Sequence, residues 1–426
     1  MPILYATDVF TPNDTPIHTY VDRRDLKLEE LLKDAVNTPK IVASVSGPSK
    51  AGKSVLIHKV MDAELIILVS GAAINKATDL WDQAIQWMGS ADVESTTDTT
   101  ATSGAISGSF KGGVSVIVAK GEASGTASTS LTQNSATTQT RRVGGLQGVI
   151  SEIGNSDFLL FVDDFHYIPR DVQEEVGRQI KFAAERGVKI CAASVPHRSD
   201  DVVRSNPELS GRIAAVNIGY WNNNELEIIG KLGFPKLNID LAPSVIERLA
   251  AEAFGSPQLM QSLCLNLCRE KRISTQLSTL TRIEISDEDL ARIFERTSSM
   301  SDYSSVIDGL HSGPKERGQE RKQFRFVDGS QGDVYRAVLL AISADPPALT
   351  FTYDDLIARV GKITVDEKPV GSSISQAVLQ MDTPLSKNLS PRVPILEWDE
   401  NILNILEPYF LFFLRSSTKL RSLGGL

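Results

Sequence analysis

Glycine, lysine and serine recur at spacings that suit phosphate binding in one short stretch of the chain. Residues 47–54 read Gly-Pro-Ser-Lys-Ala-Gly-Lys-Ser and match every fixed position of the pattern G-x-x-x-x-G-K-[S/T]. Glycines let backbone N–H groups turn toward phosphate oxygens, and a helix that begins at the loop points its positive end at the same anion. We expect Lys53 to reach the β- and γ-phosphates of a nucleotide and the Ser54 hydroxyl to bind Mg²⁺. The residues expected to hold the nucleotide in this loop are Gly47, Pro48, Ser49, Lys50, Ala51, Gly52, Lys53, Ser54 and Val55.

Two adjacent carboxylates follow an apolar run that is typical of a buried central strand. Phe158–Val162 is continuously apolar and leads into Asp163 and Asp164. Side chains at the carboxyl end of a parallel strand lie in the crevice where open α/β sheets bind ligands. We expect Asp163 to orient Mg²⁺ through water, as a second metal-site residue beside Ser54, and Asp164 to polarise the attacking water. Asp164 has a shorter arm than the glutamate that many ATPases carry at this place, which indicates slow hydrolysis.

The elements that must position these groups form an α/β sheet. Short buried runs that alternate with amphipathic segments indicate five parallel strands joined by helices. The expected strands are 41–46, 65–69, 158–162, 188–194 and 214–218, and the expected helices are 26–37, 74–88, 143–153 and 171–186. We therefore predict a nucleotide-binding α/β domain over residues 1–221.

One segment of this domain differs from the rest in composition. Residues 90–142 are dominated by Ser, Thr, Gly and Ala, with a strand-like run at Val114–Ala119. The composition fits a plain loop, and the strand-like run fits an ordered β-hairpin. A long insertion in a compact domain is usually functional. We expect this insertion to serve assembly or partner recognition.

The second half of the chain is helical and contains two further units. Four expected helices, at 222–232, 243–254, 257–273 and 286–297, predict a helical lid over residues 222–300. A polar stretch predicts a linker over 301–330. The last unit, 331–426, has expected helices at 333–343, 353–360 and 372–381, a strand at 393–398 and a final helix at 402–415. The order helix, helix, helix, strand is that of a winged helix.

The charge pattern of these units bears on their partners. The linker interleaves Lys and Arg with Glu, which favours a solvated connection over an arm that contacts phosphates. In a winged helix that binds DNA, the helix at 372–381 would enter the major groove. The unit has no basic stripe, however, so we favour contact with protein over contact with nucleic acid.

Bulk composition excludes several classes of protein. Of the 426 residues 41% are hydrophobic and 23% are charged, which is ordinary for a globular protein. The net charge of −9 gives no general attraction to nucleic acid or anionic membranes. Three cysteines are too few for a disulfide framework or a zinc site. Without a membrane-length apolar run or a signal-peptide pattern, we expect a cytoplasmic protein with no membrane partner.

Together these motifs resemble those of the AAA+ superfamily, in the branch shared by origin-recognition-type initiators and STAND signalling ATPases. Tyr20–Arg24, followed by a leucine-rich helix, resembles the entry segment near adenine. The glycine loop and the paired aspartates resemble Walker A and Walker B, and the turn at 255–258 resembles that of the family's lid. The resemblance implies a P-loop AAA+ core with a five-stranded parallel sheet, a helical lid and a C-terminal winged-helix-like domain. It also implies ATP and Mg²⁺ as cofactors.

The same resemblance gives roles to three more residues. Ser194 stands where the family's sensor 1 polar residue ends its strand, and Pro257 stands where a proline helps the lid close on nucleotide. Arg212 lies in a segment that resembles the one carrying an arginine finger, and Arg198 and Arg204 compete with it for this role. A guanidinium from a neighbouring subunit would stabilise charge on the γ-phosphate.

These observations predict a slow ATPase that acts as an oligomerising molecular switch. The residues expected to carry catalysis are Lys53, Asp163, Asp164, Ser194 and Arg212. Analogy of fold suggests that the protein is the regulatory ATPase of a prokaryotic antiphage-defence or mobile-element system. We expect it to form a homo-oligomer and to act with a separate effector protein. Two alternatives stay open: a DNA-binding ATPase similar to initiators or transposition regulators, and a nucleotide-stabilised scaffold that never turns over.

Overall fold

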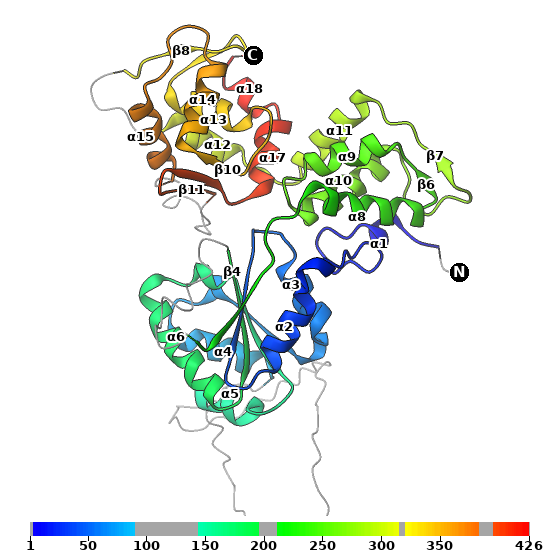
Figure 1. The fold of residues 1–426 in the computed structure, drawn as a ribbon, viewed down its shortest axis with the longest axis vertical. Helices are drawn as coiled ribbons and strands as arrows, with labels where there is room; N and C mark the ends of the chain where they lie inside the picture. Colours follow the sequence, from blue (N-terminus) through cyan, green and yellow to red (C-terminus); the bar gives the residue numbers. More distant parts are fainter. Residues whose placement is uncertain (1–2, 90–143, 196–210, 315–319, 383–394, 426) are drawn as a thin grey trace, which may run out of the picture.

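A five-stranded parallel sheet forms the centre of the first domain (Figure 1). The computed structural model describes residues 3–89, 144–195, 211–314, 320–382 and 395–425. The strands are β1 (Val42–Ser46), β2 (Ile66–Ser70), β3 (Leu159–Asp163), β4 (Lys189–Ser194) and β5 (Ile213–Asn217), in the spatial order β2-β3-β4-β1-β5. The predicted five-stranded parallel sheet is therefore confirmed. Because all strands run the same way, the residues after β1 and β3 meet at one edge.

Helices cover both faces of this sheet. One face packs against α2 (Leu28–Asn37) and α3 (Lys53–Val60), and the other against α4 (Ala77–Trp87), α5 (Gly145–Ile153) and α6 (Arg170–Glu185). Short 3-10 turns complete the domain: η1 (Arg24–Leu26), η2 (Ala63–Leu65), η3 (Gly71–Ala73) and η4 (Phe165–Tyr167). Phe161 packs in the core beside α2 and α3, whereas Leu160 and Val162 pack in the core beside α4 to α6. This burial on both faces explains why the central strand β3 reads as a continuous apolar run, whereas the edge strands β2 and β5 have exposed positions. The insertion at 90–142 lies outside the described residues.

A helical unit follows β5 and stands above the carboxyl edge of the sheet (Figure 1). It contains α8 (Asn223–Lys236), α9 (Pro243–Ala251), α10 (Pro257–Glu270) and α11 (Asp287–Ser298), with a short parallel pair of β6 (Ile239–Asp240) and β7 (Thr281–Arg282). Local sequence sets where three of these helices begin. The side chains of Asn222, Ser256 and Ser286 accept backbone N–H groups at the starts of α8, α10 and α11. The N-terminal helix α1 (Ala6–Val9) lies against this unit, where Phe10 packs on Phe234.

The last unit combines helices with small antiparallel sheets. Its helices are α12 (Ser304–Ser312), α13 (Val334–Ser343), α14 (Tyr353–Ile363), α15 (Gly371–Asp382), α17 (Pro408–Ser416) and α18 (Lys419–Ser422). Its strands are β8 (Phe324–Arg325) paired with β9 (Gln331–Gly332), and β10 (Thr350–Thr352), β11 (Leu396–Asp399) and β12 (Ile402–Ile405) in the order β10-β12-β11. Within the described ranges, no helix combines the length and apolar character that a membrane crossing requires.

Two expectations for this half of the chain are wrong. The stretch expected as a polar linker contains α12, because Val306, Ile307 and Leu310 form an apolar face that is buried. The segment expected to begin the final helix at residue 402 is instead strand β12. Glu400 and Asn401 adopt left-handed backbone angles and turn the chain into a hairpin with β11, so the helix begins only at α17.

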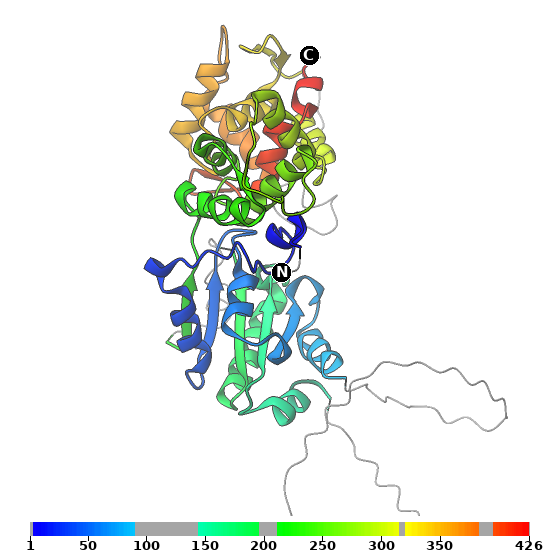
Figure 2. The same cartoon turned by 90° about the vertical axis from the view of Figure 1, so that its right-hand side faces the viewer.

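The lid and the last unit share one hydrophobic core. A single cluster of buried residues runs through α8 to α11 and on through α12 to α17, whereas the α/β domain has two separate clusters. Phe412 of α17 stands at the seam, with its ring 6.0 Å from that of Phe294 and 6.4 Å from that of Phe254. Nη2 of Arg415 lies 3.0 Å from Glu252 of the lid. The described residues between 222 and 425 thus form one packed body, called the upper body below, which Figure 2 shows above the α/β domain.

Candidate nucleotide-binding site

The glycine loop links the end of β1 to the start of α3. Gly52, the residue before α3, has φ of 94°, a left-handed angle that glycine adopts without strain, and a Cβ at this position would meet no atom within 4 Å. The Lys53 ammonium donates to the carbonyl oxygens of Gly47 and Pro48, each at 2.9 Å. The lysine side chain is therefore folded back along its own loop.

The electrostatic surroundings of Lys53 suit an anionic ligand. Its side chain is buried, and this burial lowers the pKa of the ammonium, while Asp163 and Asp164 act in the opposite direction. A buried cation that is held only by neutral carbonyls keeps unused capacity for charge-assisted hydrogen bonds. Phosphate oxygens would supply the acceptors.

The two carboxylates lie beside the loop, at the end of β3. The Ser54 hydroxyl donates to Oδ2 of Asp163 at 2.9 Å. The backbone N–H of Asp164 donates to Oδ1 of Asp163, also at 2.9 Å, and Asp164 itself has a left-handed φ of 56°. Burial raises the pKa of the Asp164 carboxyl, and the neighbouring Asp163 raises it further. The structure thus brings together the two residues expected at the metal and the one expected at the water.

One glycine that makes this turn possible escaped the sequence analysis. Gly71 follows β2, the strand beside β3, and a Cβ on it would lie 2.4 Å from the backbone oxygen of Asp164. A larger residue at position 71 would therefore push the carboxylates away from Ser54. The signal in the sequence is a glycine directly after a predicted strand, which is too common to single out.

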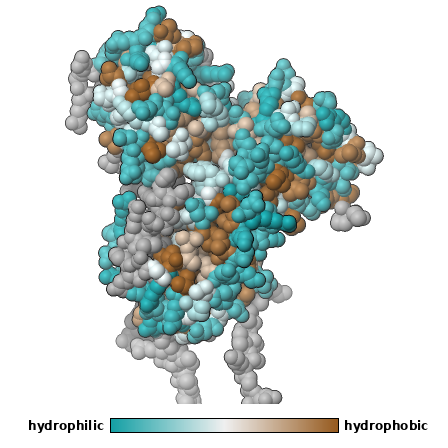
Figure 3. Space-filling view, in the orientation of Figure 1, coloured by the Kyte–Doolittle hydropathy of each residue, from teal (hydrophilic) through white to brown (hydrophobic). Residues whose placement is uncertain are grey.

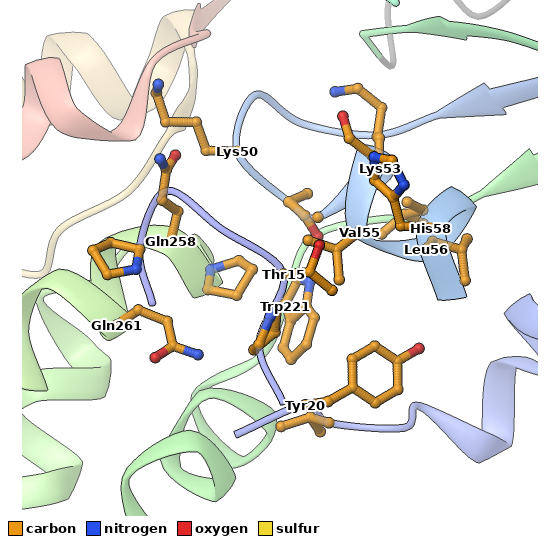
Figure 4. Close-up of a pocket in the computed structure, with 18 of the residues that line it drawn as sticks. Thr15, Tyr20, Lys50, Lys53, Val55, Leu56, His58, Trp221, Gln258 and Gln261 are labelled. Carbon is orange, nitrogen blue, oxygen red and sulfur yellow. The ribbon is translucent and has the colours of Figure 1, made fainter. Parts of the chain in front are cut away.

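A cavity of about 550 Å³ opens between the loop and the lid (Figure 4). This volume is within the usual range for sites of small ligands and cofactors. Its wall is formed by Ser49 to Val55, by Asp163 and Asp164, by the N-terminal segment from Thr11 to Arg23, and by Trp221, Pro257, Gln258 and Gln261 of the upper body and its connection. Figure 3 shows the outside of this junction, where apolar residues gather between the α/β domain and the upper body.

The N-terminal segment is fixed in the wall of the cavity by the lid. Oε1 of Gln261 accepts the N–H of Thr11 at 3.2 Å, and its Nε2 donates to Oγ1 of Thr19 at 2.7 Å. Figure 4 shows Tyr20 and Trp221 on the far side of the cavity from the tip of Lys53. Aromatic rings in the wall of the cavity can stack on a nucleotide base. The indole N–H of Trp221 also donates to the carbonyl of Ala51 at 3.0 Å.

Two of the expected catalytic residues do not line this cavity. Ser194 ends β4 in register with Ser46, and its hydroxyl is buried with no hydrogen-bond partner among the described residues. It stands next to the site, where its neighbour Val195 forms part of the wall. Arg212 precedes β5, at the opposite edge of the sheet, and its guanidinium pairs with Glu185. Arg212 therefore cannot act on the site of its own subunit. Arg198 and Arg204 lie outside the described residues.

The residues present fit a magnesium ion that arrives with its nucleotide. Across the described ranges, no group of three or more His, Cys, Asp and Glu side chains could hold a metal alone. Ser54 and Asp163 offer two oxygen ligands at one point of the cavity wall. Mg²⁺ is commonly bound by one or two protein oxygens together with substrate phosphates and water.

The sheet order, the glycine loop after β1, the aspartates after β3 and the helical lid together define the AAA+ type of P-loop ATPase fold. A solved Walker-type ATPase of Pyrococcus abyssi shares this fold, with 14% sequence identity, a TM-score of 0.50, and coverage of 96% of this chain and 99% of that one.

Two further structures resemble the chain less closely. Cdc6p of Pyrobaculum aerophilum matches at 12% identity and a TM-score of 0.43, over 99% of this chain and 100% of its own. The RuvB Holliday junction branch migration motor of Thermotoga maritima matches at 11% identity and a TM-score of 0.42, over 92% of this chain and 95% of its own. No protein family profile matches the chain. No curated protein matches it either.

Proposed function

We propose that the protein binds ATP with Mg²⁺ in the cavity between the α/β domain and the lid, and hydrolyses it slowly. The observation that supports this most directly is the joint placement of Lys53, Ser54 and Asp163 around one glycine loop. Lys53 would hold the β- and γ-phosphates, and Ser54 with Asp163 would hold Mg²⁺, which neutralises charge on the phosphates. Pro257 and Gln258 would close the cavity from the lid.

Hydrolysis requires a group that orients water and a group that stabilises charge. Asp164 has the position for the first role, and its raised pKa favours acceptance of a proton from water. Ser194 would add a hydrogen bond at the same edge, since its buried hydroxyl has no hydrogen-bond partner in the part of the chain that the structure describes. Arg212 would act from a neighbouring subunit, because it lies at the opposite edge of its own sheet. This arrangement supports turnover in an oligomer and little turnover in a monomer.

The biological role that we propose is an oligomerising switch. The analogy of fold favours the regulatory ATPase of a prokaryotic antiphage-defence or mobile-element system, in the cytoplasm, with a separate effector protein. The test is mass photometry of the protein with and without ATP, alongside hydrolysis rates over a dilution series. ATP-dependent growth in mass, and a rate per subunit that rises with concentration, are expected. Constant mass and a constant rate per subunit would overturn the switch.

Acidic partners pair with two of the basic side chains near α15, the helix that a DNA-binding winged helix would place in a groove. Arg321 pairs with Asp333 at 2.8 Å, and Lys322 pairs with Glu367. We therefore propose protein contact for this winged-helix-like unit, and keep DNA as the alternative. Binding to mixed duplex DNA across a salt series separates the two, because phosphate contacts give a steep dependence on salt.

A further inference from the structure

A carboxyl group of the upper body lies directly against the phosphate loop. The Ser49 hydroxyl donates to Oε2 of Glu407 at 3.1 Å, across 358 positions of sequence. Glu407 immediately precedes α17, and its Oε1 accepts the N–H of Tyr409 at 3.2 Å. The two oxygens of one carboxyl group thus join the first turn of α17 to the loop.

The cations that face Glu407 are lysines that could also bind the phosphates of a nucleotide. Lys50 and Lys53 of the loop act on it, and Tyr303 and Tyr409 line it from the upper body. The ammonium of Lys50 lies 5.4 Å from the ring centre of Tyr409. Burial raises the pKa of the Glu407 carboxyl, while Lys50 and then the Tyr409 N–H oppose the shift. Burial thus favours the neutral acid, whereas Lys50 and Lys53 favour the carboxylate, and the group lies beside cations that an anionic ligand would also use.

Polar contacts join the described part of the upper body to the loop. Besides the pair of Ser49 and Glu407 and the contact of Lys50 with the Tyr409 ring, the Ser256 hydroxyl lies 3.5 Å from the carbonyl of Lys50. The indole of Trp221, in the connection to the upper body, donates to Ala51. The upper body itself is held together by a continuous apolar core. A ligand that competes with Ser49 for Glu407 would therefore loosen the contact between the upper body and the loop more readily than the packing inside the upper body.

We propose that Glu407 makes the loop discriminate against nucleoside triphosphates in favour of diphosphates, because a γ-phosphate at the loop would compete with its carboxylate for the loop lysines. The inference rests on the proposed nucleotide site. A γ-phosphate would compete for the cations that face Glu407, and two anions forced together repel each other. A diphosphate leaves the carboxylate in place. Displacement by a triphosphate would free the first turn of α17 from the loop.

The test measures binding of ADP and of a nonhydrolysable ATP analogue, each with Mg²⁺, by calorimetry. Glu407→Gln removes the negative charge and keeps one of the two acceptor oxygens, so the side chain can retain the bond from Ser49 or the bond from Tyr409. We expect this variant to improve the affinity for triphosphate relative to diphosphate by about tenfold. The matched control is Glu295→Gln, the same change on an exposed position of α11, which should leave the ratio as in the wild type.

A second measurement follows the contact itself. Hydrogen exchange in the peptide that begins α17 should increase when wild-type protein binds the triphosphate analogue, and stay unchanged with ADP. The inference would be overturned by an equal ratio of triphosphate to diphosphate affinity in the wild type and in Glu407→Gln, or by hydrogen exchange that is the same with ADP and with the triphosphate analogue. Either result would leave the proposed function standing. Failure of the wild type to bind either nucleotide would overturn the proposed function and the inference with it.

Discussion

Replacing Lys53 with alanine should weaken nucleotide binding strongly while leaving the fold intact. In the structure the ammonium makes two hydrogen bonds to loop carbonyls, both at 2.9 Å, and burial lowers the pKa of the ammonium. Loss of these bonds is destabilising, but loss of a buried charge offsets it, and water from the cavity can reach the carbonyls. We expect a net change in stability within about 1 kcal/mol, or roughly 2–4 °C in melting temperature.

The effect on ATP should be much larger. Bonds from Lys53 to two phosphates would be charge-assisted on both sides, and hydrogen bonds to charged groups contribute about 1.5–3 kcal/mol each. Part of this gain replaces the carbonyl bonds that the ammonium gives up. A net loss of about 3 kcal/mol corresponds to an affinity roughly 150-fold weaker.

Calorimetry with Mg²⁺ and ATP, together with thermal unfolding, measures both quantities. Lys33→Ala is the matched control, because Lys33 is an exposed lysine on α2 that does not line the cavity. It should bind ATP like the wild type. An affinity of Lys53→Ala within threefold of the wild type, at an unchanged melting temperature, would show that the phosphates bind elsewhere and refute the site.

Three further predictions concern catalysis and the upper body. Asp163→Asn should weaken Mg²⁺-dependent ATP binding, whereas Asp164→Asn should keep ATP binding and slow turnover at least tenfold. Equal hydrolysis rates in Asp164→Asn and the wild type would exclude the role of Asp164 in orienting water. Arg212→Ala should bind ATP but not hydrolyse it, and mixing it with Lys53→Ala should restore part of the activity; full activity of diluted monomers would contradict action between subunits. Arg415→Met should lower the free energy of unfolding by about 2 kcal/mol, which is less than the cost of breaking a fully buried ion pair because Glu252 is partly exposed and Asp345 is exposed. An unchanged melting temperature would show that these ion pairs do not stabilise the protein.

Features that depend on local sequence could be predicted well. The glycine loop and the aspartates after the apolar run at 158–162 are contiguous motifs, and their positions follow from strand, loop and helix in turn. Strand β3 was readable because its burial on both faces leaves Asp163, at its end, as its one polar residue. The relation of Ser54 to Asp163 follows from the parallel sheet, which brings the ends of both strands to one edge.

Features that depend on distant contacts could not be predicted. Glu407 precedes a proline at the start of a helix, so its sequence indicates a helix cap and nothing about a loop 358 positions away. The stretch from residue 402 is apolar enough for either a strand or a helix, and only the backbone turn before it decides. Trp221 follows a predicted strand, but its contact with Ala51 depends on where the lid packs.

The core shared by the lid and the last unit decides how the protein can be dissected. A chain that stops at residue 300 would expose the apolar faces of α10 and α11 that α17 covers, including that of Phe294. Such a truncation would aggregate or melt early, and its loss of ATP binding would say nothing about regulation. A cut after β5, near Gly219, where the backbone turns with a left-handed φ of 65°, keeps the lid and the last unit together and separates N-terminal residues such as Val9 and Phe10 from the core that they share with the upper body. Expressing residues 1–221 and 222–426 as separate chains would show whether the two halves reassociate on nucleotide, an experiment that a cut at 300 cannot support.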